Sequence, residues 1–242
     1  MEKLTPKEAL EILYDRSWGN SYMPPNKLQH CVSCGEVNRK IIEKIIANRG
    51  AVYNGLSLDP DHAQSVGILH DIGCHTDRSK KHPITGYWYL LSRGVSEDIA
   101  RISLTHCYIG GDLNCSGADG ILIKEDGTIN IEPGVDWDVY DVEFLREYFK
   151  NNPYTIYDDL MNLTDLMVRE NIIGLDFRLN DVEKRYGTKA TSANHRKQAF
   201  ALLHKFENLM GCTMEEAFPE IKENQREFKE IELLKQQKIN SL

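Results

Sequence analysis

Apolar residues recur at helical spacing along most of the chain. Between residues 28 and 47, Val37, Ile41 and Ile45 recur at helical intervals, and stepping back by the same intervals reaches His30. Side chains at this spacing share one face of a helix. The pattern therefore predicts a long helix in this range, with His30 on its buried face near the start.

Capping residues indicate where other helices begin. Thr5, followed by Pro6 and Glu8, has the order of a capping box, and Asp59 stands before Pro60 as a helix N-cap. Further helices are expected from His82 to Gly94, from Ser96 to about His106, from about Thr155 to Arg169 and from Ser192 to Gly211, with an amphipathic helix in the tail after Met214.

Residues 120 to 131 have a different pattern. Two β-favouring runs flank Asp126-Gly127, which is the signal for a tight hairpin turn. An inserted β-hairpin here could act as a lid or specificity element, or it could contact a second copy in a homodimer. The expected fold is mainly α, a helical bundle with this small hairpin, in three parts: an N-terminal helix and loop (1–27), the main domain (28–211) and a helical tail (212–242).

Composition and charge exclude some classes of partner. The chain has 242 residues and a formal net charge of −8, which argues against a broad nucleic-acid-binding surface because phosphate backbones require clustered Lys and Arg. No apolar run approaches the length of a membrane span, and the first residues lack the features of a signal peptide. We therefore expect a cytoplasmic protein that binds neither a membrane nor an extended nucleic acid.

The six cysteines are scattered along the chain, which predicts reduced thiols rather than disulfides. Cys31 and Cys34 have the spacing of half a zinc site, but no second closely spaced pair completes a four-sulfur site. We interpret them as two small residues on a helix.

Candidate chemistry centres on His70 and Asp71, which end an apolar run just before Ile72-Gly73. Adjacent residues on a helix point about 100° apart, so both can reach one cation only where other segments line the same pocket. Four residues near the ends or inner faces of expected helices are candidate partners: His30, His82, His106 and Asp165. Four imidazoles and two carboxylates suit Mn, Fe, Co, Ni or Zn and are poor ligands for Cu(I).

Other histidines and acids fit this set less well. Asp158 and Asp159 stand at a helix start, where acidic residues are favourable and usually exposed. His62 lies in a first helical turn and is expected on the surface, and His195 and His204 are interpreted as structural or surface residues.

The order H…HD…H…H…D, together with the sequence His70-Asp71-Ile72-Gly73, resembles the HD-domain superfamily of metal-dependent phosphohydrolases over roughly residues 28 to 210. The resemblance implies two divalent transition metals, with Fe or Mn favoured and Co, Ni and Zn as alternatives. The implied ligands of one metal are His30, His70, Asp71 and Asp165, and those of the second are His82 and His106, with Asp71 bridging the two.

The activity implied by the resemblance is hydrolysis of a phosphomonoester or phosphodiester in a small, nucleotide-like molecule. Hydroxide held by the metals would attack phosphorus, with Asp71 and His70 at the catalytic centre. Arg78, Lys80 and Lys81 lie in the loop before His82, where they are either a clamp for the substrate phosphate or a solvated basic loop.

Two alternatives use the same fold. A di-iron oxygenase of the same superfamily, such as myo-inositol oxygenase, carries the same four-histidine, two-aspartate pattern. A non-catalytic sensor or binding module would fit Cys74, which stands where the family often has lysine, and the inserted hairpin. Hydrolysis is favoured because it is the commoner activity on this fold, and no short motif identifies the substrate.

Overall fold

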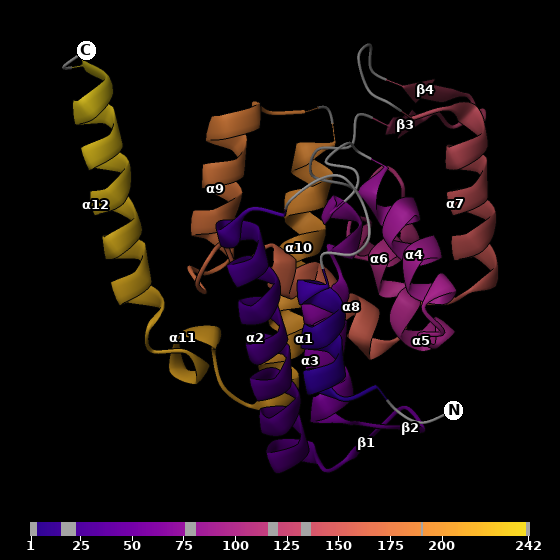
Figure 1. Cartoon of the computed structure of the whole chain (residues 1–242), viewed down its shortest axis with the longest axis horizontal. Helices are drawn as coiled ribbons and strands as arrows, with labels where there is room; N and C mark the ends of the chain where they lie inside the picture. The colour runs from indigo at the N-terminus through magenta and orange to yellow at the C-terminus, as the bar shows by residue number, and fades with distance from the viewer. Residues whose placement is uncertain are drawn as a thin grey trace.

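Helices form nearly all of the regular structure, and two small β-hairpins complete it, so the predicted fold class is confirmed (Figure 1). The computed structural model describes residues 4–15, 23–75, 81–115, 121–131, 137–189 and 191–240. The α-helices are α1 (Pro6–Tyr14), α2 (Pro25–Arg49), α3 (Pro60–Leu69), α4 (His82–Ser92), α5 (Glu97–Ala100), α6 (Ile102–Thr105), α7 (Val139–Asn151), α8 (Ile156–Asp165), α9 (Leu175–Tyr186), α10 (Ser192–Met210), α11 (Met214–Ala217) and α12 (Ile221–Asn240), and the 3₁₀ helices are η1 (Ile72–His75) and η2 (Ile109–Gly111).

The expected helix starts are present. Thr5 and Glu8 form a reciprocal capping box at the start of α1, and the Asp59 side chain accepts hydrogen bonds from the first turn of α3. Helix α2 begins at Pro25, slightly earlier than the apolar pattern predicts. Proline suits the first position of a helix because it has no backbone N–H, and an N–H there would lack an acceptor within the helix. These caps fix where α1 and α3 begin along the chain.

Helices α2 and α3 pack side by side at the centre of the molecule, with α8 and α10 against α2 (Figure 1). The buried face of α2 includes Val37, Ile41 and Ile45, as the sequence predicts, and His30 lies on the same face. Burying each such aliphatic side chain stabilises the fold by about 1.5–3 kcal/mol. The long helix is therefore anchored along its length, which fixes His30 relative to α3.

Two antiparallel hairpins are present. Strands β3 (Ile121–Ile123) and β4 (Ile129–Ile131) pair as the Asp126-Gly127 turn predicts. The second hairpin joins β1 (Val52–Tyr53) to β2 (Leu56–Ser57). Its turn residues Asn54 and Gly55 have φ values of 48° and 80°, which suit Asn-Gly in a tight hairpin turn.

Several expectations about individual elements are wrong. The expected helix from Ser96 to His106 is divided into α5 and α6, and α8 ends at Asp165 rather than Arg169. Helix α9 has no counterpart among the elements expected from the sequence. Asp158 is fully buried rather than exposed, because Arg101 and a threonine of α6 cover it.

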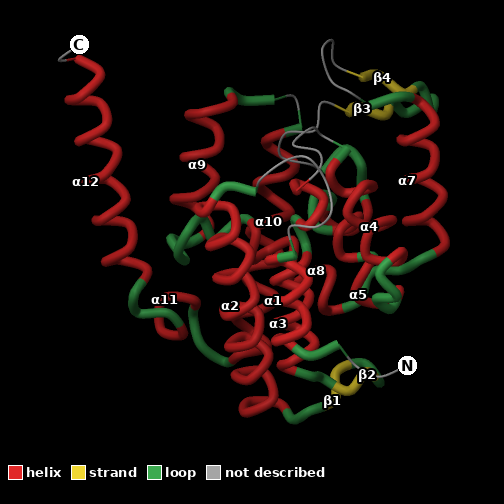
Figure 2. The backbone as a smooth tube through the Cα atoms, in the orientation of Figure 1, coloured by secondary structure: helices red, strands yellow, loops and turns green. Residues whose placement is uncertain are grey.

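The tail forms a helix whose first half packs on the rest of the protein. Gln225 of α12 donates a hydrogen bond to the carbonyl oxygen of Ile173, and Phe228 packs edge-to-face on Phe177 of α9. Farther along, Ile231 and Leu234 are exposed as α12 leads away from the bundle (Figure 2). Among the described residues, no helix combines the length and the apolar character needed to cross a membrane.

Candidate metal centre

The Asp71 carboxylate lies where α2, α3, α4, α6 and α8 meet, and four histidines surround it. Helix α3 ends at Leu69, so His70 is its C-cap and Asp71 begins the turn into η1. Both side chains are buried, with His70 0% and Asp71 2% exposed. The adjacent pair is therefore presented at a helix end inside the protein, as the sequence argument requires.

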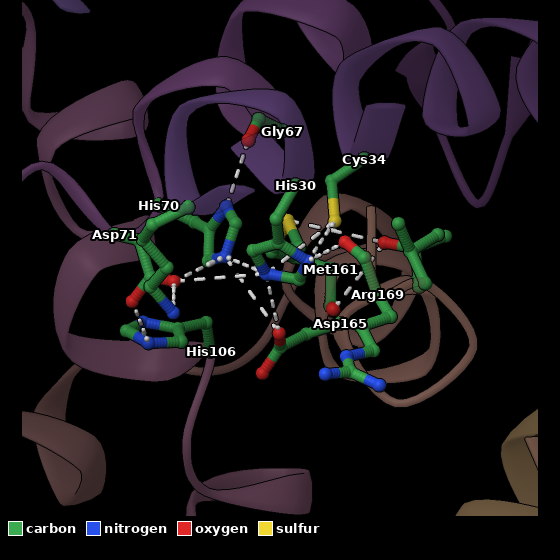
Figure 3. Close-up of polar contacts among 12 residues, drawn as sticks. His30, Cys34, Gly67, His70, Asp71, His106, Met161, Asp165 and Arg169 are labelled. Atoms are coloured by element: carbon green, nitrogen blue, oxygen red, sulfur yellow. Dashed lines mark hydrogen bonds and ion pairs between the residues drawn. The ribbon is translucent and has the colours of Figure 1, made fainter. Parts of the chain in front are cut away.

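One group of ligand atoms gathers around the Oδ2 side of Asp71. Nε2 of His30 lies 3.2 Å from Nε2 of His70 and 3.0 Å from Oδ1 of Asp165. Oδ2 of Asp71 is 3.1 Å from Nε2 of His70 and 3.6 Å from Nε2 of His30. Figure 3 shows these side chains pointing toward one another from α2, the end of α3 and the end of α8.

A second group lies on the Oδ1 side of the same carboxylate. Nε2 of His82, at the start of α4, is 3.2 Å from Nε2 of His106, which follows α6. Oδ1 of Asp71 is 3.3 Å from the His82 nitrogen and 3.6 Å from the His106 nitrogen. The structure thus brings together all six residues that the sequence singles out, and Asp71 offers one oxygen to each group.

Hydrogen bonds to backbone carbonyls fix which ring nitrogen can bind a cation. Nδ1 of His70 donates to the Gly67 carbonyl oxygen (2.7 Å), Nδ1 of His30 to that of Arg169 (2.9 Å) and Nδ1 of His106 to that of Ser103 (2.9 Å). A carbonyl oxygen only accepts, so each Nδ1 carries a proton, and a ring that gives up its Nε2 proton turns that lone pair into the centre. Two lone pairs cannot hydrogen-bond each other, and a cation between them satisfies both.

The spacing of the ligand atoms also fits a metal. Ligand atoms about 2.1 Å from one cation lie about 3.0–3.4 Å from their neighbours in tetrahedral or octahedral geometry. The distances of 3.0–3.6 Å in the first group and 3.2–3.6 Å in the second overlap this range. His30, His70, Asp71 and Asp165 all lie close enough together to share one ion. The clusters of this protein could therefore hold metal ions.

Charge at the centre favours ionised carboxylates. Burial alone would raise the pKa of Asp71, but the Lys27 ammonium and His70 outweigh it, and the pKa lies well below its usual value. Burial likewise opposes ionisation of Asp165, but its hydrogen bond with His30 lowers the pKa. Both carboxylates are thus negative at neutral pH, as metal ligands must be.

Lys27 is a residue of the centre that the sequence argument missed. Its Nζ forms an ion pair with Oδ2 of Asp71, and it lies on α2 one turn before His30. That three-residue spacing, which places Lys27 and His30 on one helix face, is a signal that could have identified it. Burial alone would lower the pKa of Lys27, but Asp71 outweighs it and holds the lysine protonated.

The centre is open on one side. The side chains of Lys27, Asp165 and His82 are 34%, 26% and 17% exposed, whereas those of His30 and His70 are 6% and 0% exposed. A small molecule can therefore approach from the side of Lys27 and Asp165.

Three thiols border the two groups. Cys34 Sγ lies 3.9 Å from Nε2 of His30, and Cys74 Sγ is 3.6 Å from Oδ1 of Asp71. Cys107 Sγ is 3.2 Å from Nε2 of His106. From the sequence, Cys34 is interpreted as a small residue on a helix, and Cys74 and Cys107 are not among the candidate ligands.

The predicted basic clamp is only partly described. Arg78 and Lys80 lie outside the described residues. Lys81 places its Nζ 2.6 Å from Asp141 and 3.5 Å from Asp138, at the start of α7. These ion pairs join Lys81 to the acidic N-terminal turn of α7.

Close backbone packing brings α4 to Asp71. A β-carbon on Gly73 would lie 2.0 Å from the carbonyl oxygen of His82, and one on Gly86 would lie 2.2 Å from Oγ of Ser103. Gly86 thus lets α4 approach a neighbouring helix closely. These two glycines allow η1, α4 and α6 to come close enough for His82 and His106 to face Asp71.

The histidines outside the ligand set lie in other environments. His75 is buried, and its Nε2 contacts the carbonyl oxygen of Leu13 at 2.8 Å, so it packs with α1. The side chain of His62 is 13% exposed and packs edge-to-face on Tyr157, so it is not a free surface residue. His195 is buried and His204 is exposed on α10, in keeping with their interpretation as structural or surface residues.

The fold and this centre define a mainly helical protein with a buried histidine and carboxylate cluster able to hold metal ions. Comparisons of the chain with family models, curated proteins and solved structures find no match.

Proposed function

We propose that this protein is a metal-dependent phosphohydrolase of the HD type, acting on a small phosphomonoester or phosphodiester. The observation that carries the proposal is the position of Asp71, whose two oxygens face two separate pairs of histidine nitrogens. A carboxylate that faces two ligand groups is suited to bridge two divalent cations, and the resemblance to the HD superfamily favours Fe or Mn.

The proposed ligands divide around Asp71. His30, His70 and Asp165 would hold one cation, and His82 and His106 the other. When bound, the two cations would lower the pKa of a water and offset the negative charge of a phosphoryl group. The Nδ1 hydrogen bonds to Gly67, Arg169 and Ser103 keep the rings in place, so the ligand geometry needs little reorganisation.

Lys27 is the proposed substrate contact. Its ammonium lies at the open side of the centre, beside the carboxylate that would carry the metals. Once metals neutralise Asp71, Lys27 is free to turn to a phosphoryl oxygen and form a charge-assisted hydrogen bond. The family often has a lysine at the position of Cys74. In this role Lys27 supplies the positive side-chain charge that Cys74 lacks. Arg78, Lys80 and Lys81 remain a predicted second source of positive charge.

The test measures metal content and hydrolysis together. We expect about two equivalents of metal per chain in the native protein and one or fewer when His82 and His106 are both replaced by alanine. With Mn²⁺ or Fe²⁺ restored, the native protein should hydrolyse p-nitrophenyl phosphate or its bis-ester in the absence of O₂. Asp71→Asn should lose this activity, and His204→Ala, an exposed histidine on α10, should retain it.

Turnover that requires O₂ would contradict hydrolysis and favour the oxygenase alternative. Full metal content without activity on a broad panel of phosphoesters, or on any substrate with O₂, would favour a binding module.

A further inference from the structure

We propose that Cys107 is a ligand of the second metal, so that the His82 and His106 half of the centre is a mixed nitrogen and sulfur site that prefers Zn²⁺ or Co²⁺ to Mn²⁺. The inference rests on the metal centre of the proposed function and concerns which metal one half of it takes. It implies a centre with two chemically different halves, because His30, His70, Asp71 and Asp165 offer only nitrogen and oxygen on the other side.

The distances around Cys107 support a shared ion. Its Sγ lies 3.2 Å from Nε2 of His106 and 3.9 Å from Nε2 of His82, and those two nitrogens are 3.2 Å apart. With metal–nitrogen bonds of about 2.0–2.1 Å and a metal–sulfur bond of about 2.3 Å, tetrahedral geometry places nitrogen and sulfur about 3.5 Å apart. The observed triangle brackets that value, and its three atoms all lie close enough together to hold one ion.

The backbone that carries Cys107 is held in position. Helix α6 ends at Thr105, and Nδ2 of Asn162 donates to the carbonyl oxygens of both Thr105 (2.8 Å) and His106 (2.7 Å). The Tyr154 hydroxyl donates to the carbonyl oxygen of Tyr108 at 2.6 Å. These bonds hold the residues on both sides of Cys107, so its thiol is presented beside His106 by a fixed turn.

The other two thiols fit a metal less well. Cys34 Sγ is nearly equidistant from the two ring nitrogens of His30, at 3.8 and 3.9 Å, so it is not directed along the Nε2 lone pair, although it forms a possible ligand group with His30 and His70. Cys74 Sγ donates to Oδ1 of Asp71, and it forms a possible ligand group with Asp71 and His82. Cys74 is therefore the rival to Cys107 for the same half of the centre.

Binding through sulfur has a defined proton balance. The Cys107 S–H bond breaks, a sulfur–metal bond forms, and the proton passes to solvent, since only the thiolate is a ligand. A thiolate is a softer donor than imidazole or carboxylate, so it shifts the preference of the site toward Zn²⁺ and Co²⁺ and away from Mn²⁺.

Cobalt provides the test, because Co²⁺ bound by thiolate has a near-ultraviolet sulfur-to-metal charge-transfer band. We would titrate the metal-free full chain with Co²⁺ and record its spectrum, with bound cobalt measured separately. We expect the band in the native protein, its loss in Cys107→Ser, and its retention in Cys34→Ser, Cys74→Ser and Cys115→Ser. Loss of the thiolate should also weaken binding of one Zn²⁺ equivalent at least about tenfold, with Mn²⁺ binding little changed.

Several outcomes would overturn the proposal. They are bound cobalt without a charge-transfer band in the native protein, a band that survives in Cys107→Ser, a band that is lost in Cys74→Ser instead, and no cobalt binding at all. Circular dichroism shows whether each variant is folded, and a misfolded Cys107→Ser is replaced by Cys107→Ala. The band does not depend on turnover, so a native protein that shows the band but hydrolyses no phosphoester would contradict the proposed function and leave this inference standing.

Discussion

Gly67 of α3 lies directly against Gly35 of α2, and a β-carbon on Gly67 would be 2.5 Å from the Gly35 amide nitrogen. This close approach also positions the metal centre, because the Gly67 carbonyl oxygen accepts a hydrogen bond from Nδ1 of His70 and His30 lies on the facing helix. The contact between the two helices thus places His30 and His70 on one side of Asp71.

Gly67→Ala should therefore destabilise the protein. The added methyl group meets backbone atoms that cannot rotate away, so α2 and α3 must separate, at a cost of about 1–3 kcal/mol or more. Urea unfolding measures the change, and Glu36→Ala on the exposed face of α2 should shift stability by less than about 0.5 kcal/mol. Equal stability of the two variants would show that the helices do not pack as tightly as this contact requires.

Lys27→Met should separate metal binding from substrate binding. Removing an ammonium that pairs with Asp71 leaves the carboxylate free for metal, so metal affinity should increase. The same change removes a charge-assisted contact to the phosphoryl group, so KM should rise about tenfold or more. Isothermal titration with Mn²⁺ and steady-state kinetics measure the two effects. Lys40→Met, which removes a surface lysine paired with Glu220, should change neither.

Asp158→Ala should be strongly destabilising. The Asp158 carboxylate is fully buried and accepts hydrogen bonds from Nε of Arg101 (3.2 Å) and Oγ1 of Thr105 (2.8 Å). Removing one partner of a buried ion pair leaves an uncompensated charge, which costs about 3–5 kcal/mol. The exposed pair of Lys7 and Glu11 offers the control, since Glu11→Ala should cost less than about 1 kcal/mol in the same thermal or chemical unfolding experiment.

The ion pair of Asp158 and Arg101 joins α6 to α8, so its loss should also weaken metal binding at the centre. Helix α6 leads into His106 and α8 ends at Asp165. Metal retention measured on the folded fraction of Asp158→Ala should be lower than in the native protein. Retention at the native level would mean that the two helices are held together by their other contacts.

Cys115 should make stability fall at alkaline pH. Burial, with a smaller contribution from Asp112, raises the pKa of its thiol from 9.0 to about 12. Between these values the folded protein keeps a proton that the unfolded chain has lost, so stability is complete below about pH 9 and declines as pH rises toward about 12. Cys115→Ala should remove up to about 1.4 kcal/mol of this decline for each pH unit in that window.

Urea unfolding at several pH values measures this slope in both proteins. The smaller side chain of Cys115→Ala also lowers the free energy of unfolding at every pH. This difference is measured at pH 7 and subtracted from the values at higher pH. Parallel stability curves for Cys115→Ala and the native protein would contradict the raised pKa.

Local signals along the chain were sufficient for much of the fold. Thr5 and Asp59 cap helices as predicted, and the Asp126-Gly127 turn joins two paired strands, because capping and tight turns depend on a few neighbouring residues. Burial of Asp158 could not be predicted from such local signals. Its position at a helix start predicts exposure, and only the packing of α6 across α8 covers it.

The candidate ligands show the same division. Chemical type and order identified the six residues from His30 to Asp165, and the expected helical face of α2 placed His30 inward. The distances between them could not be predicted from the chain order, because they come from five separate segments. Lys27 and Cys107 were missed because their roles depend on contacts in space, with Asp71 for the lysine and His82 for the thiol, although Lys27 shares a helix face with His30.

The sequence by itself therefore determined the helical class, the helix starts, the hairpin and the set of candidate ligands, since periodicity, caps and residue chemistry are properties of the chain. Tertiary structure alone decided that one Asp71 carboxylate faces two groups of nitrogen atoms, and that an ammonium and a thiol border them. The physical reason is that convergence depends on how closely helices approach. Where Gly67 meets Gly35, neither residue has a side chain that would separate the two helices. At Gly73 no side chain stands opposite the carbonyl oxygen of His82, so these backbones can also approach closely.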